Sequence, residues 1–268
     1  MFLNVNGHKT YCYTGGKPFD AARPTVVFIH GVLNDHSVWI LQTRYFAHHG
    51  FNVLAPDLPG HGRSAGTPPA SVEDGAKFIA GLQDAAGVAQ AALVGHSFGS
   101  LIALETAASV PPRVAQLALV GTAAPMKVSA ALLDASLNQP MKAIDMVNTY
   151  SHSMLAPPPS ALGPGTWLYG GSRALMKRVL AGNTTVNLFH TGFKACDDYT
   201  GGEAAMAQVK CPVLFILGHD DQMTPPRAAQ ALVDRCANGK VVLLKAGHQL
   251  MTEAPDGVLF ALKSFIKA

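Results

Sequence analysis

A serine between two glycines is the strongest chemical signal in this sequence. The segment from Gly95 to Gly99 reads Gly-His-Ser-Phe-Gly, follows the apolar run 91–94 and precedes the helix-like run 100–108. In that context a sharp strand-to-helix turn lifts the serine hydroxyl clear of the sheet edge, and the glycines let strand and helix approach closely. The positive end of the helix favours negative charge that develops there. We therefore predict that Ser97 is a nucleophile.

A serine hydroxyl needs a base within hydrogen-bond reach, and the base needs an acid that orients it. Both residue types follow apolar runs near the end of the chain: Asp220 and Asp221 come after 213–217, and His248 comes after 241–244. We expect these side chains on loops at the same edge of a sheet as Ser97. The order Ser, Asp, His along the chain fits this arrangement and makes His248 the predicted general base.

The elements that must position these residues alternate along the chain. Short apolar runs separated by helix-like stretches are typical of a parallel sheet covered on both faces. The first thirteen residues are expected to form a hairpin. Strands are expected at 25–29, 52–55, 92–94, 117–120, 213–217 and 241–244, and helices at 39–49, 72–87, 101–109, 227–236 and 254–266. We therefore predict an α/β fold with a doubly wound, mostly parallel sheet.

The interval 123–206 interrupts this alternation. It lacks a convincing strand, whereas apolar residues such as Leu132 and Val147 recur at roughly helical spacing. We predict a helical cap inserted after the fourth core parallel strand, over the sheet edge where open α/β folds bind ligands. The expected domains are a core of residues 1–122 and 207–268 and a cap of residues 123–206. The methionines and leucines of the cap could line an acyl pocket or pack the cap on the sheet.

Three further motifs, together with the serine segment, make the chain similar to the α/β-hydrolase superfamily from about Phe2 to the C-terminus. His30-Gly31 resembles the oxyanion-loop motif of that family, and residues 57–64 resemble its Asp-x-x-Gly-x-Gly-x-Ser turn. Gly247-His248 with the later Glu253-x-Pro255 resembles its catalytic-histidine loop. This resemblance is specific for the fold but not for the substrate.

The resemblance also implies roles for single residues. The family pattern counts three residues on from the glycine that ends a strand, here Gly218, and so implies Asp221 as the acid, with the adjacent Asp220 as the alternative. The main-chain amides of Val32 and Phe98 are expected to form the oxyanion hole. Relatives that open epoxides or displace halide use an aspartate where this chain has Ser97, so those reactions are disfavoured.

A serine triad with two amide donors fits acyl transfer to water. We therefore expect a serine hydrolase that cleaves a small-to-medium, mostly apolar carboxylic ester through an acyl-enzyme. One alternative is a carbon–carbon bond hydrolase or an enol-lactonase of aromatic degradation with the same triad. Arg173, Lys177 and Arg178 are candidates to bind a substrate carboxylate in that case. A non-catalytic ligand receptor with the same fold also stays open.

Composition excludes several other classes. The chain has 268 residues, of which 49% are hydrophobic and 14% charged, and its net charge of +3 is too small to indicate a nucleic-acid partner. The four cysteines form no Cys-x-x-Cys pair, so we expect no disulfide framework, no metal and no other cofactor. A signal peptide and apolar runs of the ~20 residues that span a bilayer are lacking. We thus expect a cytoplasmic enzyme with a small-molecule substrate and no membrane partner, in an oligomeric state that the sequence leaves open.

Overall fold

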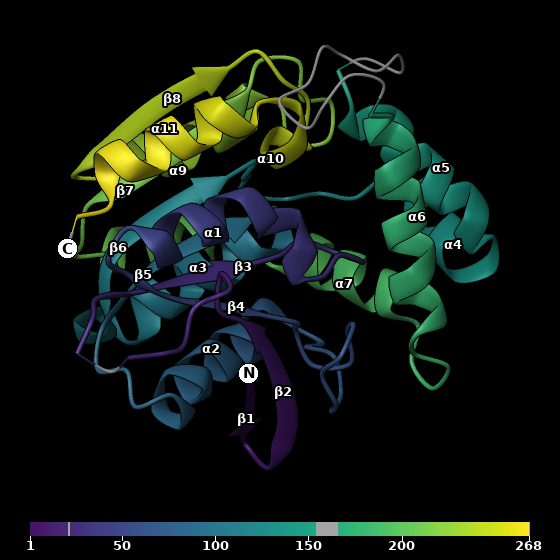
Figure 1. Ribbon diagram of the computed structural model, residues 1–268. Coiled ribbons are helices and arrows are strands. Elements are labelled where there is room, and N and C mark those ends of the chain that lie inside the picture. Colours follow the sequence, from purple (N-terminus) through teal and green to yellow (C-terminus); the bar gives the residue numbers. More distant parts are fainter. Residues whose placement is uncertain (21, 154–165, 268) are drawn as a thin grey trace.

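The computed structural model describes residues 1–20, 22–153 and 166–267, and within them the chain forms an eight-stranded sheet (Figure 1). The strand order is β1-β2-β4-β3-β5-β6-β7-β8. The hairpin of β1 and β2 adds to β4 in antiparallel fashion, whereas the strands from β4 to β8 in this order run parallel. The predicted mostly parallel sheet is therefore confirmed. The strands are β1 (Phe2–Val5), β2 (His8–Tyr13), β3 (Thr25–Ile29), β4 (Asn52–Pro56), β5 (Ala91–His96), β6 (Val114–Val120), β7 (Val213–Gly218) and β8 (Gly239–Leu244).

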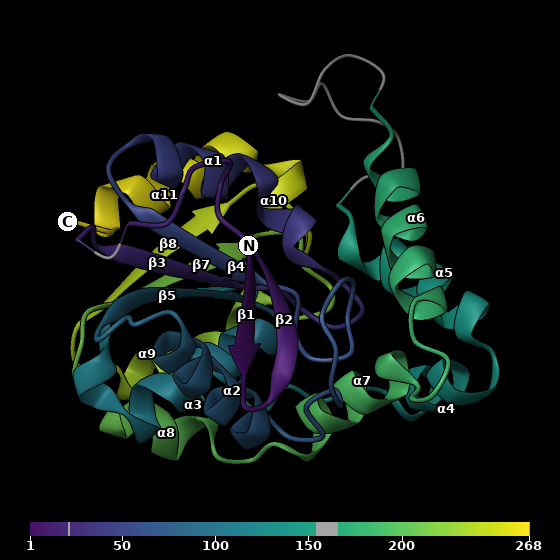
Figure 2. The same cartoon turned by 60° about the horizontal axis from the view of Figure 1, so that its bottom comes forward.

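Helices cover both faces of the sheet, so the fold is doubly wound (Figure 2). One face carries α1 (Ile40–His48) and α11 (Pro255–Phe265). The opposite face carries α2 (Val72–Ala85), α3 (Phe98–Ser109), α8 (Gly202–Gln208) and α9 (Gln230–Arg235). The shorter turns of helix are η1 (His36–Trp39), η2 (Pro111–Arg113), η3 (Pro226–Ala229) and α10 (Leu250–Glu253).

The core strands are apolar throughout because both of their faces are covered. Every residue of β3, β4, β5 and β7 is buried. Successive side chains of a strand point to opposite faces, so Val27 and Ile29 of β3 belong to the apolar layer under α2 and α3. Val26 and Phe28 belong to the layer under α1 and α11. This two-sided burial explains why the sequence shows continuous apolar runs instead of alternation.

The described residues between β6 and β7 form helices and no strand. The helices are α4 (Ala130–Asn138), α5 (Pro140–Ser151), α6 (Leu168–Ala181), α7 (Leu188–Asp198) and α8, and residues 154–165 of the predicted cap lie outside the described part. Helices α4 to α7 stand at one side of the sheet, whereas α8 packs against α3 and α9 (Figures 1 and 2). Ile144, Met176 and Phe189 share an apolar cluster with Leu33 from the loop after β3. These four helices therefore pack on a loop that the sheet positions.

The helices of the described residues include none that is both long and apolar enough to cross a lipid bilayer.

Candidate active site

Ser97 lies on the turn between β5 and α3. Its backbone has φ 54° and ψ −121°, in the left-handed region that non-glycine residues rarely adopt. A Cβ on Gly95 would overlap the backbone of Gly99, and a Cβ on Gly99 would overlap the carbonyl oxygen of Ile29 in β3. The two glycines thus allow α3 to start directly against the sheet. The turn leaves the Ser97 side chain half-buried at the wall of a cavity.

His248 and Asp221 meet behind this turn. His248 lies in the loop after β8, and its Nδ1 is 2.8 Å from Oδ2 of Asp221, which lies in the loop after β7. A carboxylate only accepts hydrogen bonds, so Nδ1 carries the proton that it donates and Nε2 is left as an acceptor. Thr224 Oγ1 donates to the same carboxylate oxygen at 2.9 Å, and the amides of Met223 and Thr224 donate to Oδ1 at 2.8 Å. The Asp221 carboxylate is thereby held in one orientation.

The environment keeps Asp221 ionised. Burial acts to raise its pKa, but the charge of His248 and the hydrogen bonds from His248 and Thr224 outweigh burial and lower the pKa from 3.8 to about 2. Asp220, the alternative from the sequence, instead lies half-exposed and accepts a hydrogen bond from Nδ1 of His219 at 2.7 Å. The structure brings Asp221, and not Asp220, to His248.

His96 is a buried partner of His248 that the sequence analysis did not identify. Its Nε2 donates to the main-chain carbonyl oxygen of His248 at 2.9 Å, and the two ring centroids are 4.7 Å apart. Burial and the nearby charge of His248 lower the pKa of His96 from 6.5 to about 3, so the ring is neutral. This contact joins residues 152 positions apart. No local sequence pattern could have indicated it.

The loop after β3 brings Val32 to the serine. A Cβ on Gly31 would lie 3.2 Å from the Ser97 Cβ, so the backbone before Val32 passes directly beside the serine. His30 anchors this loop, since its Nε2 accepts from the amide of Leu58 at 3.0 Å and its Nδ1 donates to the Gly31 carbonyl at 2.8 Å. Phe98, the other residue expected to supply an oxyanion amide, is the first residue of α3.

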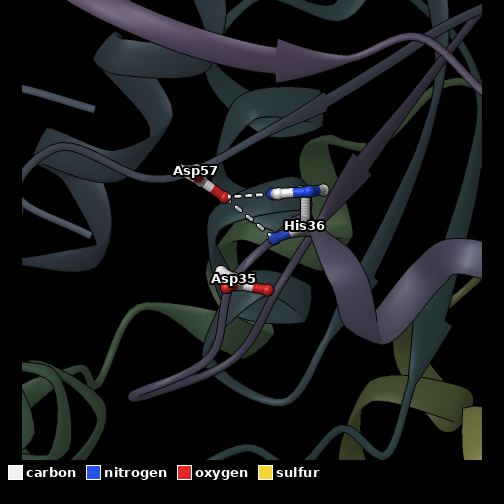
Figure 3. A group of neighbouring side chains, drawn as sticks. All are labelled: Asp35, His36 and Asp57. Atoms are coloured by element: carbon white, nitrogen blue, oxygen red, sulfur yellow. Dashed lines mark hydrogen bonds and ion pairs between the residues drawn. The ribbon is translucent and has the colours of Figure 1, made fainter. Parts of the chain in front are cut away.

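Three side chains of ligand type gather farther along this loop (Figure 3). His36 donates to Asp57 Oδ1 from its main-chain amide at 3.0 Å and from Nδ1 at 2.7 Å. The Asp35 carboxylate accepts from the main-chain amide of Ser37 at 2.9 Å and from Nη2 of Arg178 in α6 at 2.7 Å. These bonds occupy both carboxylates and tie the loop to the turn at Asp57 and to α6.

A cavity of about 450 Å³ opens in front of Ser97 and His248. Most of its wall is apolar and comes from the loop after β6 and from α4, α5 and α7, with Met126, Leu132, Met146 and Phe193 among the lining residues. A volume of this size is in the range of small-molecule sites, roughly 300 to 1,000 Å³. The helices between β6 and β7 therefore supply the wall opposite the serine.

The cations considered for a substrate carboxylate lie elsewhere. Arg173 pairs with Asp145 at 2.5 Å and Arg178 pairs with Asp35, and neither they nor Lys177 are among the described residues that line this cavity. Lys127 is the one Lys or Arg among the described lining residues. Its ammonium donates to the carbonyl oxygen of Asp197 at 2.6 Å and lies 3.7 Å from the carboxylate of the same residue.

Comparisons with known proteins agree with this architecture. A model of the alpha/beta hydrolase family matches residues 26–261. The putative carbamate hydrolase RutD of a Caulobacter species is 27% identical over 262 residues, which are 94% of this chain and 93% of that protein. Lipase LipV of Mycobacterium tuberculosis is 36% identical over 119 residues, 43% of this chain and 44% of the lipase. The alignments span only 31% to 54% of the length of several curated relatives.

The fold also matches a solved structure over its whole length. An esterase from Exiguobacterium antarcticum superimposes with a TM-score of 0.83 at 18% identity, covering 100% of this chain and 99% of the esterase. Identity at this level supports the shared fold alone.

Proposed function

The chain belongs to the alpha/beta hydrolase family, and on that premise we propose that it is a serine hydrolase cleaving a small-to-medium, mostly apolar carboxylic ester. One fold hosts many reactions, so the proposal rests on the site. The observation that carries it is the 2.8 Å hydrogen bond between His248 and Asp221, beside a serine on a left-handed turn in the same cavity.

In the proposed first half-reaction, Ser97 Oγ attacks the ester carbonyl carbon while His248 Nε2 takes the hydroxyl proton. Asp221 holds the histidine tautomer and stabilises the imidazolium that forms. His248 then gives the proton to the leaving alkoxide oxygen, the acyl carbon–oxygen bond breaks, and the alcohol departs from an acyl-enzyme. In the second half-reaction a water loses its proton to His248, attacks the acyl carbon and releases the acid and Ser97.

We assign the stabilisation of the oxyanion to the amides of Val32 and Phe98. The proximity of Gly31 to Ser97 supports the first assignment. The position of Phe98 as the first residue of α3 supports the second, because the first amides of a helix have no partner within it and carry its positive end.

The state of the cations favours a neutral ester over a substrate that carries a carboxylate. Lys127, the one lysine or arginine among the described residues of the cavity wall, is already bound to Asp197, and Arg173 and Arg178 are bound to aspartates outside the wall. A substrate carboxylate would have to compete with these partners. The wall itself offers mostly apolar contacts, which suit an acyl chain.

We further infer that α4 to α7 act as the cap of this site. Leu132 of α4, Met146 of α5 and Phe193 of α7 line the cavity that contains Ser97. Since α8 packs beside α3, the mobile unit of such a cap would end before α8, although the interval 123–206 includes it.

The direct test is labelling with a fluorophosphonate probe, which reacts with an activated serine. We expect the wild-type protein to be labelled and Ser97→Ala to remain unlabelled. A screen of p-nitrophenyl esters of graded acyl length, with a ring-cleavage dienoate alongside, then identifies the reaction. Preference for the dienoate would support a carbon–carbon hydrolase, and a folded protein that neither reacts with the probe nor hydrolyses any ester would support a ligand receptor.

A further inference from the structure

Two cavities of very different size meet at Ser97. Besides the cavity of about 450 Å³, a second one of about 20 Å³ lies against the loop after β3. The two cavities share four lining residues, which are Ser97, Phe193, Met223 and His248. About 10–15 Å³ suffices for one water molecule, so the small cavity, as the described residues bound it, accommodates a single water-sized group.

The small cavity is polar and incompletely hydrogen-bonded. His96 and Ser151 both line it, with 1% and 0% of their surfaces exposed. Neither His96 Nδ1 nor Ser151 Oγ has a hydrogen-bond partner among the described residues. His96 carries its proton on Nε2, so Nδ1 is an acceptor, whereas the Ser151 hydroxyl can donate or accept. Leaving such atoms unpaired costs free energy, which favours a ligand group that forms hydrogen bonds here.

We propose that the small cavity binds the alcohol half of the ester and the large cavity the acyl half, so that the enzyme selects esters of long apolar acids with alcohols about as small as methanol. This inference rests on the proposed function. The leaving alcohol and the incoming water both exchange a proton with His248, so both hydroxyl groups occupy one place beside it. A polar cavity of one-water size fits either group, and the apolar wall of the large cavity fits a hydrocarbon chain.

Two apolar side chains limit the small cavity on the side of the inserted helices. Val147 of α5 and Met176 of α6 line the small cavity but are not among the described residues of the large one. Both are buried, with 7% and 2% of their surfaces exposed. They therefore set the largest alcohol that the site accepts.

The first experiment compares two isomers, methyl octanoate and heptyl acetate, which contain the same atoms and differ only in which half is long. We expect kcat/KM for methyl octanoate to be at least about ten-fold higher, since a misplaced chain loses the apolar pocket. Equal or faster hydrolysis of heptyl acetate would overturn this assignment and leave the serine hydrolase intact. Failure of both esters together with absent fluorophosphonate labelling would instead overturn the proposed function.

The second experiment enlarges one cavity at a time. Met176→Ala should raise the ratio of propyl octanoate to methyl octanoate hydrolysis by about ten-fold. Met146→Ala is the matched control, because Met146 lines only the large cavity; it should change the preferred acyl length and leave this ratio as in the wild type. Val147→Ala provides a second test on another helix if Met176→Ala does not fold. An unchanged ratio in the folded variants, or an equal change in Met146→Ala, contradicts the proposal.

Discussion

Asp220 and Asp221 are neighbours in the chain, yet their carboxylates lie in different surroundings. The Asp220 side chain is 39% exposed and that of Asp221 is fully buried. Only Asp221 accepts hydrogen bonds from His248, Thr224 and the local backbone. At the scale of single residues, the chemistry therefore depends on which of two adjacent carboxylates the loop turns inward.

Asp221→Asn should lower kcat by about 10⁴-fold, because an amide does not stabilise the imidazolium and favours the wrong histidine tautomer. Asp220→Asn, the matched control one residue away, should stay within about two-fold of the wild type because its carboxylate is bound only to a half-exposed network with His219. Steady-state kinetics with a p-nitrophenyl ester measures both. The opposite ranking would assign the acid to Asp220.

Ser97 combines the proposed nucleophile with a strained backbone. Ser97→Ala and Ser97→Gly should both lose activity by about a million-fold, as expected when a triad nucleophile is removed. The two variants should differ in stability, because glycine adopts a φ of 54° without the penalty that alanine retains. We expect the free energy of unfolding of Ser97→Gly to exceed that of Ser97→Ala by about 1 kcal/mol in urea denaturation. Equal stabilities would show that the turn stores no strain.

At the scale of elements, the site depends on how closely α3 and the loop after β3 approach each other. Gly99 lets the first turn of α3 touch the carbonyl end of β3. The loop is fixed at three points, by His30 to Leu58, by His36 to Asp57 and by Asp35 to Arg178. The last contact reaches α6, so the inserted helices are connected to the same loop that carries Val32.

Gly99→Ala should destabilise the protein by about 3 kcal/mol, because the added Cβ overlaps backbone oxygens that cannot move away. The control is Gly171→Ala in α6, where no described atom lies within 4 Å of the new Cβ. This change should stabilise the protein by roughly 0.5–1 kcal/mol, since alanine is the better helix former. Chemical denaturation measures both changes, and a neutral effect of Gly99→Ala would mean that α3 can shift away from the sheet.

At the scale of the whole molecule, buried histidines link stability to pH. His30, His61 and His96 lie inside the protein at or near the site. Burial lowers the pKa of His30, and burial together with a neighbouring histidine lowers the pKa of His61 and His96 from 6.5 to about 3. In the unfolded chain these rings take up protons below pH 6.5, whereas in the folded protein they stay neutral.

The free energy of unfolding should therefore fall as the pH drops from about 6.5 toward 3 and be fully retained above that range. Each histidine contributes a slope of roughly 1.4 kcal/mol per pH unit within this window. Urea denaturation at several pH values measures the slope. His61→Asn should reduce it by the share of one histidine, and an unchanged slope would show that His61 is protonated in the folded protein.

Much of the fold follows from the sequence alone, because a parallel sheet buried on both faces leaves continuous apolar runs that are visible without neighbours. The runs at 25–29 and 213–217 correspond to β3 and to most of β7. The position of Ser97 between β5 and α3 was also evident, since strand, glycine turn and helix are local features. The order of Ser97, Asp221 and His248 along the chain needed no spatial information either.

Only the tertiary structure decided the contacts between distant segments. The bond from Asp221 to His248 depends on how two loops turn after β7 and β8, and the bond from His96 to His248 joins residues 152 positions apart. The division into a large apolar and a small polar cavity depends on how α4 to α7 pack opposite Ser97. Helical periodicity indicates that a helix has an apolar face, but the partner of that face is set by packing across the molecule.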